Sequence, residues 1–192
     1  MVKTYLFTGL QSLGQEFIDK CICFFPEWRR EQMLSFKFLQ GKIENAVAYL
    51  LLVKALKDLG MLAGMPQFEY NAHGKPFLKD YQGIFFSLSH CKRGVVCVVS
   101  DSNVGVDIEC VERNAHEKLI RYVCNAQECN AIFSSADPAL SFMEYWTKKE
   151  AVVKYLGTGI DTGTIKEILS DNSVRCTTRI IDGCVVSTCL PL

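Results

Sequence analysis

The stretch Phe142-Met-Glu-Tyr-Trp-Thr-Lys-Lys-Glu-Ala-Val-Val-Lys-Tyr-Leu156 places a dense polar insert inside an otherwise apolar segment. Asp137-Pro138 supplies an N-cap followed by a proline at the first helical position, and Gly157 stands where helices commonly end. The sequence therefore predicts one helix over residues 138–156. We expect the rest of the chain to be organised around it.

The polar residues of this predicted helix fall on two faces. Glu150 and Lys154 are four residues apart and share one face, whereas Trp146, Lys149 and Val153 line a neighbouring one. One flank can therefore be buried while the other presents charge. An isolated Glu-to-Lys pair is usually a solvated contact worth roughly 0.2–0.5 kcal/mol, so a functional interpretation needs support from elsewhere in the sequence.

The composition indicates a compact protein without a dominant charge. The chain has 192 residues, 49% hydrophobic and 22% charged, which suits one large domain or two small ones. Its 21 basic and 21 acidic side chains balance, so the whole-chain charge favours neither nucleic acid nor a membrane surface as a partner. No cationic segment with an apolar stretch and a cleavage site opens the sequence, so we expect a cytoplasmic protein.

The ten cysteines have two alternative explanations. In a secreted chain they would suggest disulfides, but without an export signal we expect them to stay reduced. The spacings Cys21-x-Cys23 and Cys124-x4-Cys129 lack the paired pattern of a zinc ribbon. Buried thiols are therefore the expected role.

The two halves of the chain follow the same predicted order, a strand, then helices that include one long helix, then three strands. For the first half we predict a strand at 2–8, helices within 12–25 and from Pro26, a long helix at 41–59, and strands at 67–70, 84–89 and 94–100. For the second half we predict a strand at 104–110, helices within 115–134, the helix 138–156, and strands at 164–169, 174–181 and 184–190, the last two joined by the hairpin turn Asp182-Gly183.

This order predicts an α+β fold of two similar lobes in a pseudo-twofold, pseudo-dimer arrangement. The N-terminal lobe would cover residues 1–101, and the C-terminal lobe, with a metal site, residues 102–192. No low-complexity linker separates the halves. We therefore expect one rigid body with a ligand-binding cleft between the lobes.

The strand Val104-Gly-Val-Asp-Ile-Glu-Cys110 is the candidate for that metal site. Its two-residue period places Asp107 and Glu109 on one face and the alternate apolar residues on the other, where they would pack inward. Two carboxylates about 7 Å apart repel unless a cation or water separates them. With Glu150 as a third oxygen ligand the ion would be Mg²⁺, although Asp-x-Glu alone is usually an ordinary polar face. Gly105 indicates either close backbone approach or a bulge.

Groups suited to phosphate precede this strand. Phe86-Ser-Leu-Ser-His-Cys91 places Ser87 and Ser89 on one strand face and His90 at the strand end, and Lys75 lies in the preceding turn. Hydroxyl, imidazole and ammonium groups can all donate to a phosphate. A lone histidine at a strand end is more often structural or merely exposed.

Four motifs in this order resemble those of the 4′-phosphopantetheinyl transferase superfamily. They are Gly74-Lys75-Pro76, Phe86-Ser-Leu-Ser-His-Cys91, Val104-Gly-Val-Asp-Ile-Glu109 and Trp146-Thr-Lys-Lys-Glu-Ala-Val-Val-Lys154. Together they are far more specific than any one of them. The length of the chain resembles the two-lobed, surfactin-synthetase-activating type, whereas the holo-carrier-synthase type has about half this length and forms trimers.

The resemblance implies that coenzyme A donates its phosphopantetheine arm to a serine of an apo acyl, peptidyl or aryl carrier protein, with release of adenosine 3′,5′-bisphosphate. Mg²⁺ would be the cofactor. The implied roles are metal ligation by Asp107, Glu109 and Glu150, contact with the reacting pyrophosphate by Lys154 and Lys149, nucleotide binding by Gly74, Lys75 and Pro76, and 3′-phosphate binding by Ser89 and His90.

Two further positions carry alternatives. The family has an acidic residue in the helix before the long one, which makes Glu128 the candidate catalytic base, but Asn125-x-x-Glu128 is also a capping-box pattern. The family usually has a phosphate-binding arginine where this chain reads Lys42. Lys42 itself, or Arg29 with its neighbour Arg30, would replace it, and Arg29 is our candidate, although adjacent arginines at a helix start are more often solvent-exposed.

Two other classes of function stay open. One is a regulatory protein that binds coenzyme A or a nucleotide without catalysis, and the other is a magnesium-dependent nucleotide phosphodiesterase that uses water as acceptor. The products separate them from a transferase. The sequence does not name the carrier protein, and the fusion of two lobes favours a monomer.

Overall fold

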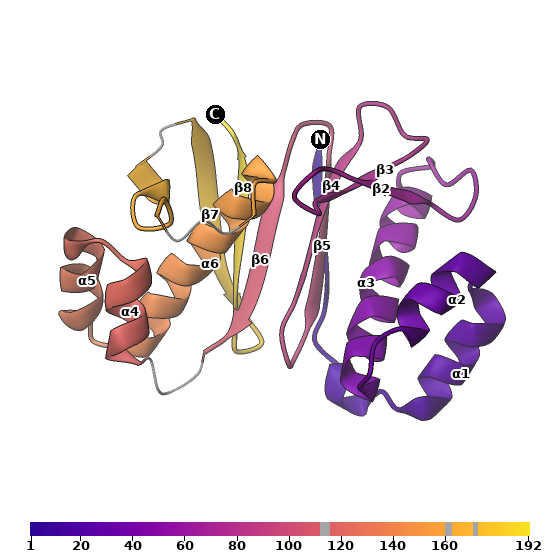
Figure 1. Cartoon of the computed structure of the whole chain (residues 1–192), viewed down its shortest axis with the longest axis horizontal. Coiled ribbons are helices and arrows are strands. Elements are labelled where there is room, and N and C mark those ends of the chain that lie inside the picture. The colour runs from indigo at the N-terminus through magenta and orange to yellow at the C-terminus, as the bar shows by residue number, and fades with distance from the viewer. Residues whose placement is uncertain (112–115, 160–162, 171–172) are drawn as a thin grey trace.

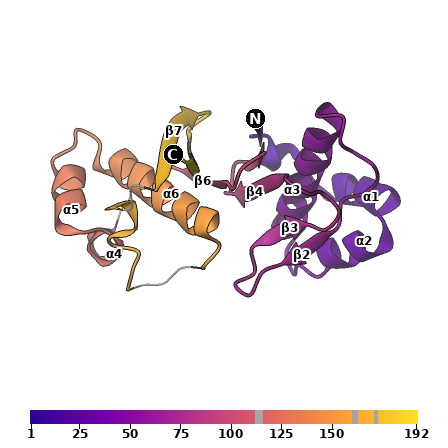
Figure 2. The same ribbon diagram turned by 90° about the horizontal axis from the view of Figure 1, so that it is seen from above.

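The computed structural model describes residues 1–111, 116–159, 163–170 and 173–192. Its helices and antiparallel strands form an α+β fold, as predicted. The sheets of the two halves meet in the middle of the molecule, and the helices α1, α2 and α3 and the helices α4 and α5 lie at opposite ends (Figures 1 and 2).

The N-terminal half has a three-stranded sheet covered by helices. Its strands lie in the order β1 (Val2–Phe7), β5 (Val95–Ser100), β4 (Phe85–His90). The helices are α1 (Gln15–Phe24), α2 (Glu27–Leu34) and α3 (Leu39–Asp58), and η1 (Leu10–Ser12) is a 3-10 turn. A small hairpin of β2 (Phe68–Tyr70) and β3 (Pro76–Leu78) follows α3. The core forms because α3 buries Tyr49, Leu52 and Leu56 completely against the sheet and the other helices.

The C-terminal half repeats this arrangement. Its strands lie in the order β6 (Gly105–Cys110), β8 (Cys184–Pro191), β7 (Val174–Ile181). The helices are α4 (Glu117–Val123), α5 (Ala126–Phe133) and α6 (Pro138–Leu156), with η2 (Ile168–Ser170) as a 3-10 turn. In each sheet the first strand of the half pairs with its last, which pairs in turn with the one before it. The division at residues 101–102 falls in the turn between β5 and β6, and the pseudo-twofold relation stays a prediction.

Helix α6 begins and ends as predicted. The Asp137 side chain accepts a hydrogen bond of 3.0 Å from the backbone N–H of Leu140, and Pro138 occupies the first helical position. Gly157 ends the helix in the left-handed conformation with φ +68°, which glycine adopts without steric penalty.

The predicted strand at 164–169 is wrong, because this segment forms turns and part of η2. The carbonyl oxygens of Ile165 and Lys166 accept hydrogen bonds of 2.9 and 3.0 Å from the Lys149 ammonium group, so these acceptors are not used in a sheet. Pro76, which the sequence places at the end of a turn, begins the short strand β3 in the structure. The predicted helical stretch 115–134 begins at a residue outside the described ranges, and α4 and α5 lie within it.

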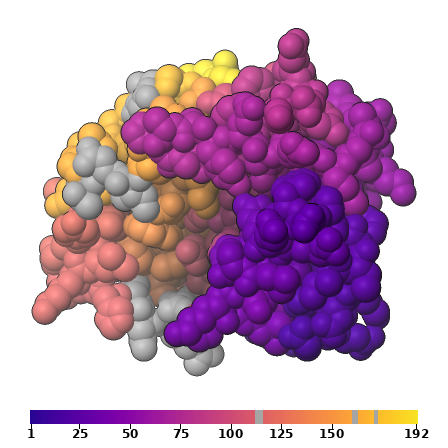
Figure 3. All heavy atoms as spheres, turned by 45° about the vertical axis from the view of Figure 1, so that its right-hand side comes forward, coloured from indigo at the N-terminus to yellow at the C-terminus, as the bar shows by residue number. Residues whose placement is uncertain are grey.

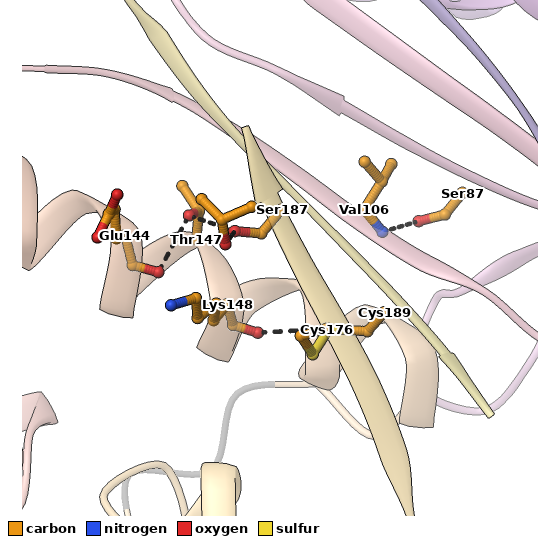
Figure 4. The surroundings of a disulfide bond; sticks show 9 residues. Ser87, Val106, Glu144, Thr147, Lys148, Cys176, Ser187 and Cys189 are labelled. Carbon is orange, nitrogen blue, oxygen red and sulfur yellow. Dashed lines mark hydrogen bonds between the residues drawn. A yellow bond between two sulfur atoms is a disulfide. The ribbon is translucent and has the colours of Figure 1, made fainter. Parts of the chain in front are cut away.

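The two halves share a core across strands β4, β5, β6 and β8. Val96, Val98, Val106, Ile108 and Val186 bury their side chains together there, which confirms that the apolar face of β6 packs inward. Strands β4 and β6 share no backbone ladder. Instead, the Ser87 hydroxyl accepts a hydrogen bond of 3.0 Å from the backbone N–H of Val106 (Figure 4). A serine side chain therefore satisfies part of the open edge of β6.

The expectation that all cysteines stay reduced is wrong for one pair. Cys176 and Cys189 form a disulfide between β7 and β8, beneath α6 (Figure 4). They lie directly opposite each other in the β7–β8 ladder, so strand register brings them together. The other eight cysteines are free. Within the described ranges, none of the helices is long and apolar enough to cross a membrane.

Candidate active site between the two lobes

A close contact between α6 and β6 builds the candidate site. A Cβ atom on Gly105 would lie 1.9 Å from the carbonyl oxygen of Ala151, so only glycine permits this approach. The structure thus confirms close backbone approach rather than a bulge. As a result, Glu150 and Lys154 of α6 face the carboxylates of β6.

Asp107 is the centre of a compact polar network. One of its oxygens, Oδ1, lies 2.6 Å from Nζ of Lys154 and accepts a hydrogen bond of 2.7 Å from the Ser89 hydroxyl. Lys154 also donates to Ser89, at 2.7 Å. The side chain of Asp107 is buried, and its second oxygen, Oδ2, has no hydrogen-bond partner among the described residues. A buried unpaired carboxylate oxygen is costly, which makes Oδ2 a candidate ligand atom.

Two more carboxylates crowd this centre. Burial, followed by the negative charge of Asp107, raises the pKa of Glu109 to about 7, although Lys154 and a hydrogen bond from Trp146 act the other way. The same two causes raise the pKa of Glu150. Crowded carboxylates with raised pKa values favour a bound cation. The donor set of three carboxylates, one with a free buried oxygen, fits Mg²⁺.

The three carboxylates are spread out in the described residues. Their ligand atoms do not form a group within 4.8 Å of one another in the part of the chain that the structure describes. Lys154 supplies a positive charge at Oδ1 of Asp107, whereas Oδ2 has no partner among these residues. An ion and Lys154 could therefore bind different oxygens of the same carboxylate.

A cleft of ≈ 250 Å³ lies beside this network. It is lined from the N-terminal half by His73, Gly74, Lys75, Pro76, Phe86, Ser87 and Leu88, and from the C-terminal half by Val153, Lys154, Gly157 and Gly159. In Figure 3 the purple segment with β2 and β3 overhangs the orange α6, and the surface is hollowed below it. Residues of the first and last motifs therefore meet in one cleft.

Lys75, from the N-terminal half, contacts two residues of the C-terminal half. Its ammonium group donates hydrogen bonds of 2.8 Å to the Asn103 side chain and 3.0 Å to the Tyr155 carbonyl. Burial lowers the pKa of Lys75 to about 8. Gly74, with φ +83°, forms the turn that presents it.

Asn71, which none of the sequence motifs includes, holds this turn together. Its side-chain oxygen accepts from the backbone N–H groups of His73 and Lys75 at 2.9 Å each, and its amide donates to the Gly157 carbonyl at 2.8 Å. An asparagine at the start of a turn that contains a glycine is a typical signal for such bonds. Its partner at the end of α6 has no signal in the sequence.

Glu128 and Lys149 lie together, away from the Asp107 network. Lys149 is fully buried, and its ammonium group is 2.9 Å from Glu128 Oε2. The same oxygen accepts from the backbone N–H of Asn125, and the Asn125 side chain accepts from the Glu128 N–H, each at 2.9 Å. The predicted capping box is therefore present. Among the described residues, the Lys149 ammonium group contacts the Glu128 carboxylate and the backbone carbonyls of Ile165 and Lys166.

The structure does not bring Arg29 or His90 to the network. Arg29 is 2% exposed, stacks over the Tyr49 ring at 4.3 Å and donates to the Asn45 carbonyl at 2.6 Å. This contradicts the expectation that Arg29 reaches a phosphate, because its guanidinium group is enclosed in the N-terminal core. His90 is exposed, with Nδ1 3.3 Å from Glu44 Oε2, and on β4 it faces away from Ser89.

A known protein family matches this region of the chain. Residues 103–184, which span β6 to the start of β8, match the model of the 4′-phosphopantetheinyl transferase superfamily. The match covers less than half of the chain, and in this region the chain is similar to the superfamily.

Individual relatives carry the superfamily name as well. The chain is 33% identical to the 4′-phosphopantetheinyl transferase HetI of Nostoc sp. over 109 residues, which cover 53% of this chain and 46% of the relative. It is 36% identical to the 4′-phosphopantetheinyl transferase gsp of Aneurinibacillus migulanus over 48% of this chain and 39% of that relative. A 4′-phosphopantetheinyl transferase of Bacillus subtilis is 23% identical over 90% of this chain and 82% of its own length. The chain thus matches less than half of the length of the first two relatives.

Proposed function

We propose that this chain is a member of the 4′-phosphopantetheinyl transferase superfamily and transfers the 4′-phosphopantetheine group of coenzyme A to a serine of an apo carrier protein. The serine oxygen would form a bond to the phosphorus of the phosphopantetheine arm. The bond from that phosphorus to the bridging pyrophosphate oxygen would break, and adenosine 3′,5′-bisphosphate would leave with the electron pair.

One observation carries the proposal: a cleft lined by groups suited to phosphate lies next to the carboxylate cluster around Asp107. Cationic donors from both lobes, Lys75 and Lys154, line the cleft or its edge, and a buried carboxylate oxygen without a partner lies next to them. Phosphoryl transfer depends mainly on positioning and on charge stabilisation. This site offers both, for an anionic substrate and a divalent cation.

Asp107, Glu109 and Glu150 would hold the cation. When bound, Mg²⁺ supplies charge neutralisation at the pyrophosphate. Lys154 would contact the reacting phosphate, and Ser89 would donate its hydroxyl hydrogen to a phosphate oxygen. Lys75, with Gly74 and Pro76, would hold the nucleotide end in the cleft. Because Arg29 is buried and Lys149 is paired, neither is assigned a contact with coenzyme A.

Glu128 is our candidate for the group that takes the serine proton. Its carboxylate is held in place by the Asn125 N–H and the Lys149 ammonium group, which supports a fixed orientation. A positioned general base contributes typically about 10²–10⁴-fold to the rate. We further propose the two-lobed, surfactin-synthetase-activating type of the family, acting as a monomer in the cytoplasm.

Intact-mass measurement of apo carrier proteins tests the proposal. The full chain, coenzyme A and Mg²⁺ are incubated with a panel of apo carriers, and one carrier should gain the mass of a single phosphopantetheine arm. Asp107→Asn should abolish this gain, whereas the exposed Asp19→Asn on α1 is the matched control and should not. Free phosphopantetheine formed without a carrier would instead support a phosphodiesterase, and binding of coenzyme A without either product would support a regulatory protein.

A further inference from the structure

Three cysteines from both lobes bring their sulfur atoms together at one end of the central strands. Cys91 lies in the turn after β4, Cys110 ends β6 and Cys184 begins β8. The Cys110 and Cys91 sulfurs are 3.3 Å apart, and the Cys91 and Cys184 sulfurs are 3.9 Å apart. Figure 1 shows the β4–β5 and β7–β8 turns at this same end of the molecule. The opposite end of β6 contacts Lys75 through Val104, so the cluster is separate from the cleft.

The spacing of the sulfurs suits a metal ion. All three lie within 4.8 Å of one another. An ion that holds sulfur ligands at about 2.3 Å requires sulfur–sulfur distances of roughly 3.8–4.0 Å in trigonal or tetrahedral geometry. The Cys91–Cys184 distance of 3.9 Å lies within this range and the Cys110–Cys91 distance of 3.3 Å is shorter, so closure needs only small side-chain movements. Thiolate ligands select soft ions such as Zn²⁺ and Cu⁺.

A tight turn and a nearby cation surround the sulfurs. The backbone N–H of Cys91 donates a hydrogen bond of 2.9 Å to the Gly94 carbonyl, which closes the turn that carries this thiol. Arg93 in the same turn reaches across to the β7–β8 turn, where a Cβ on Gly183 would lie 2.9 Å from its guanidinium Nη1. A positive charge at this place offsets the negative charge that coordinated thiolates carry.

Cys91 and Cys184 lie in an apolar core cluster with Cys110 packed against it, just as Cys21 and Cys97 lie in other apolar clusters. This group differs from the other buried cysteines because its three sulfurs, from separate segments, lie within 4.8 Å of one another. Cys110 is only partly buried, so an ion has a path from solvent to the group.

We propose that Cys91, Cys110 and Cys184 bind one thiophilic ion, Zn²⁺ or Cu⁺, which links the β4 turn of the N-terminal half to strands β6 and β8 of the C-terminal half. Each thiol that coordinates releases its proton to solvent, and no electron is transferred. The site is distinct from the carboxylates around Asp107, because Mg²⁺ prefers oxygen ligands and thiolates do not suit it.

Metal titration of the full chain tests this site. The protein is freed of metal with a chelator under mild reduction that leaves the Cys176–Cys189 disulfide intact, and is titrated anaerobically with Zn²⁺ against a chromophoric chelator, and separately with Cu⁺. We expect one equivalent bound and a higher Tm. Cys110→Ser, the substitution least disturbing to the core, should weaken binding by about 100-fold or more and remove the Tm increase. Cys23→Ser on the surface of α1 is the matched control and should change neither.

Cys184→Ala provides a second variant, so the test does not depend on the folding of one. Binding that persists unchanged in both Cys110→Ser and Cys184→Ala would overturn the proposal, as would the absence of Zn²⁺ and Cu⁺ binding by the parent. Cys110 and Cys184 are also direct neighbours in the β6–β8 ladder. A disulfide between them in anaerobically purified protein, detected by peptide mapping, would likewise overturn it. The relative affinities for the two ions identify which one the site prefers.

Discussion

The ammonium group of Lys149 lies 2.9 Å from the carboxylate of Glu128, and both side chains are enclosed in the C-terminal half. The pair joins α5 to α6, and Lys149 also binds the carbonyls of Ile165 and Lys166. One buried ion pair therefore fixes two helices and an irregular segment. Lys149 and Glu150 are adjacent in the sequence, but Lys149 is directed to Glu128 and Glu150 to the site. The sequence alone does not identify Glu128 as the partner of Lys149.

Glu128→Gln should be clearly destabilising, even though a capping box accepts glutamine as well as glutamate. The change would leave the fully buried Lys149 ammonium group without its carboxylate, and loss of one partner of a buried pair typically costs about 3–5 kcal/mol. Urea unfolding measures the loss. The matched double variant Glu128→Gln with Lys149→Met should recover most of it, because both charges are then gone. A Glu128→Gln protein as stable as the parent would contradict the buried pair.

The same double variant tests Glu128 as the base without a folding defect. If Glu128 takes the serine proton, kcat for carrier modification should fall by ~10²–10⁴-fold while coenzyme A binding persists. Lys149→Met with Glu128 retained is the kinetic control, provided that it folds. Near-parental kcat in the double variant would leave Glu128 a structural residue only.

Gly105→Ala should separate α6 from β6. The added Cβ would lie 1.9 Å from a backbone oxygen that cannot rotate away, so the cost should be at the upper end of overpacking, about 3 kcal/mol, and Tm should fall by roughly 6–12 °C. Coenzyme A binding should weaken as well, because Lys154 moves away from Asp107. Gly64→Ala, where a Cβ meets nothing within 4 Å, is the control and should leave Tm near the parental value.

Metal-free stability should fall as the pH rises from about 4.5 to about 7. The folded-state pKa of Glu109 is raised from an ordinary 4.5 to about 7, so over this window the folded state holds a proton that the unfolded state has lost. That contribution to stability is fully present below the window and is lost through it. Glu109→Gln should reduce this slope in urea unfolding across the window, leaving the part due to Glu150. An unchanged slope would argue against the crowded carboxylates.

Coenzyme A affinity should decrease above a pH of about 8 if the charged form of Lys75 holds a phosphate. Burial lowers the pKa of Lys75 from an ordinary 10.5 to about 8, so its ammonium charge is lost earlier than in solution. Without ligand, the sign is opposite, and this group makes stability rise between about 8 and 10.5, where only the unfolded state keeps the proton. Titration calorimetry at several pH values measures the affinity. Lys75→Arg should abolish the decrease, and Lys75→Met should bind weakly throughout.

Local chemistry in the sequence determined the elements that need no distant partner. Asp137-Pro138 and Gly157 delimit α6, because caps act through bonds within one helical turn. Asp182-Gly183 forms the predicted hairpin, with both residues at positive φ. The two-residue period of β6 placed Asp107 and Glu109 on one face, and the Asn125 capping box was visible for the same local reason.

Only the tertiary structure decided which face met which partner. Spacing along α6 placed Lys149 and Lys154 on neighbouring faces, but only the packing of α5 shows that Lys149 is buried, and only the approach of β6 at Gly105 directs Lys154 to Asp107. Strand register joined Cys176 to Cys189 and gathered Cys91, Cys110 and Cys184. Arg29 entered the N-terminal core because Tyr49 and a backbone carbonyl of α3 accept its guanidinium group there. These outcomes depend on contacts between residues far apart in the chain, and the period and composition of a segment carry no record of its distant neighbours.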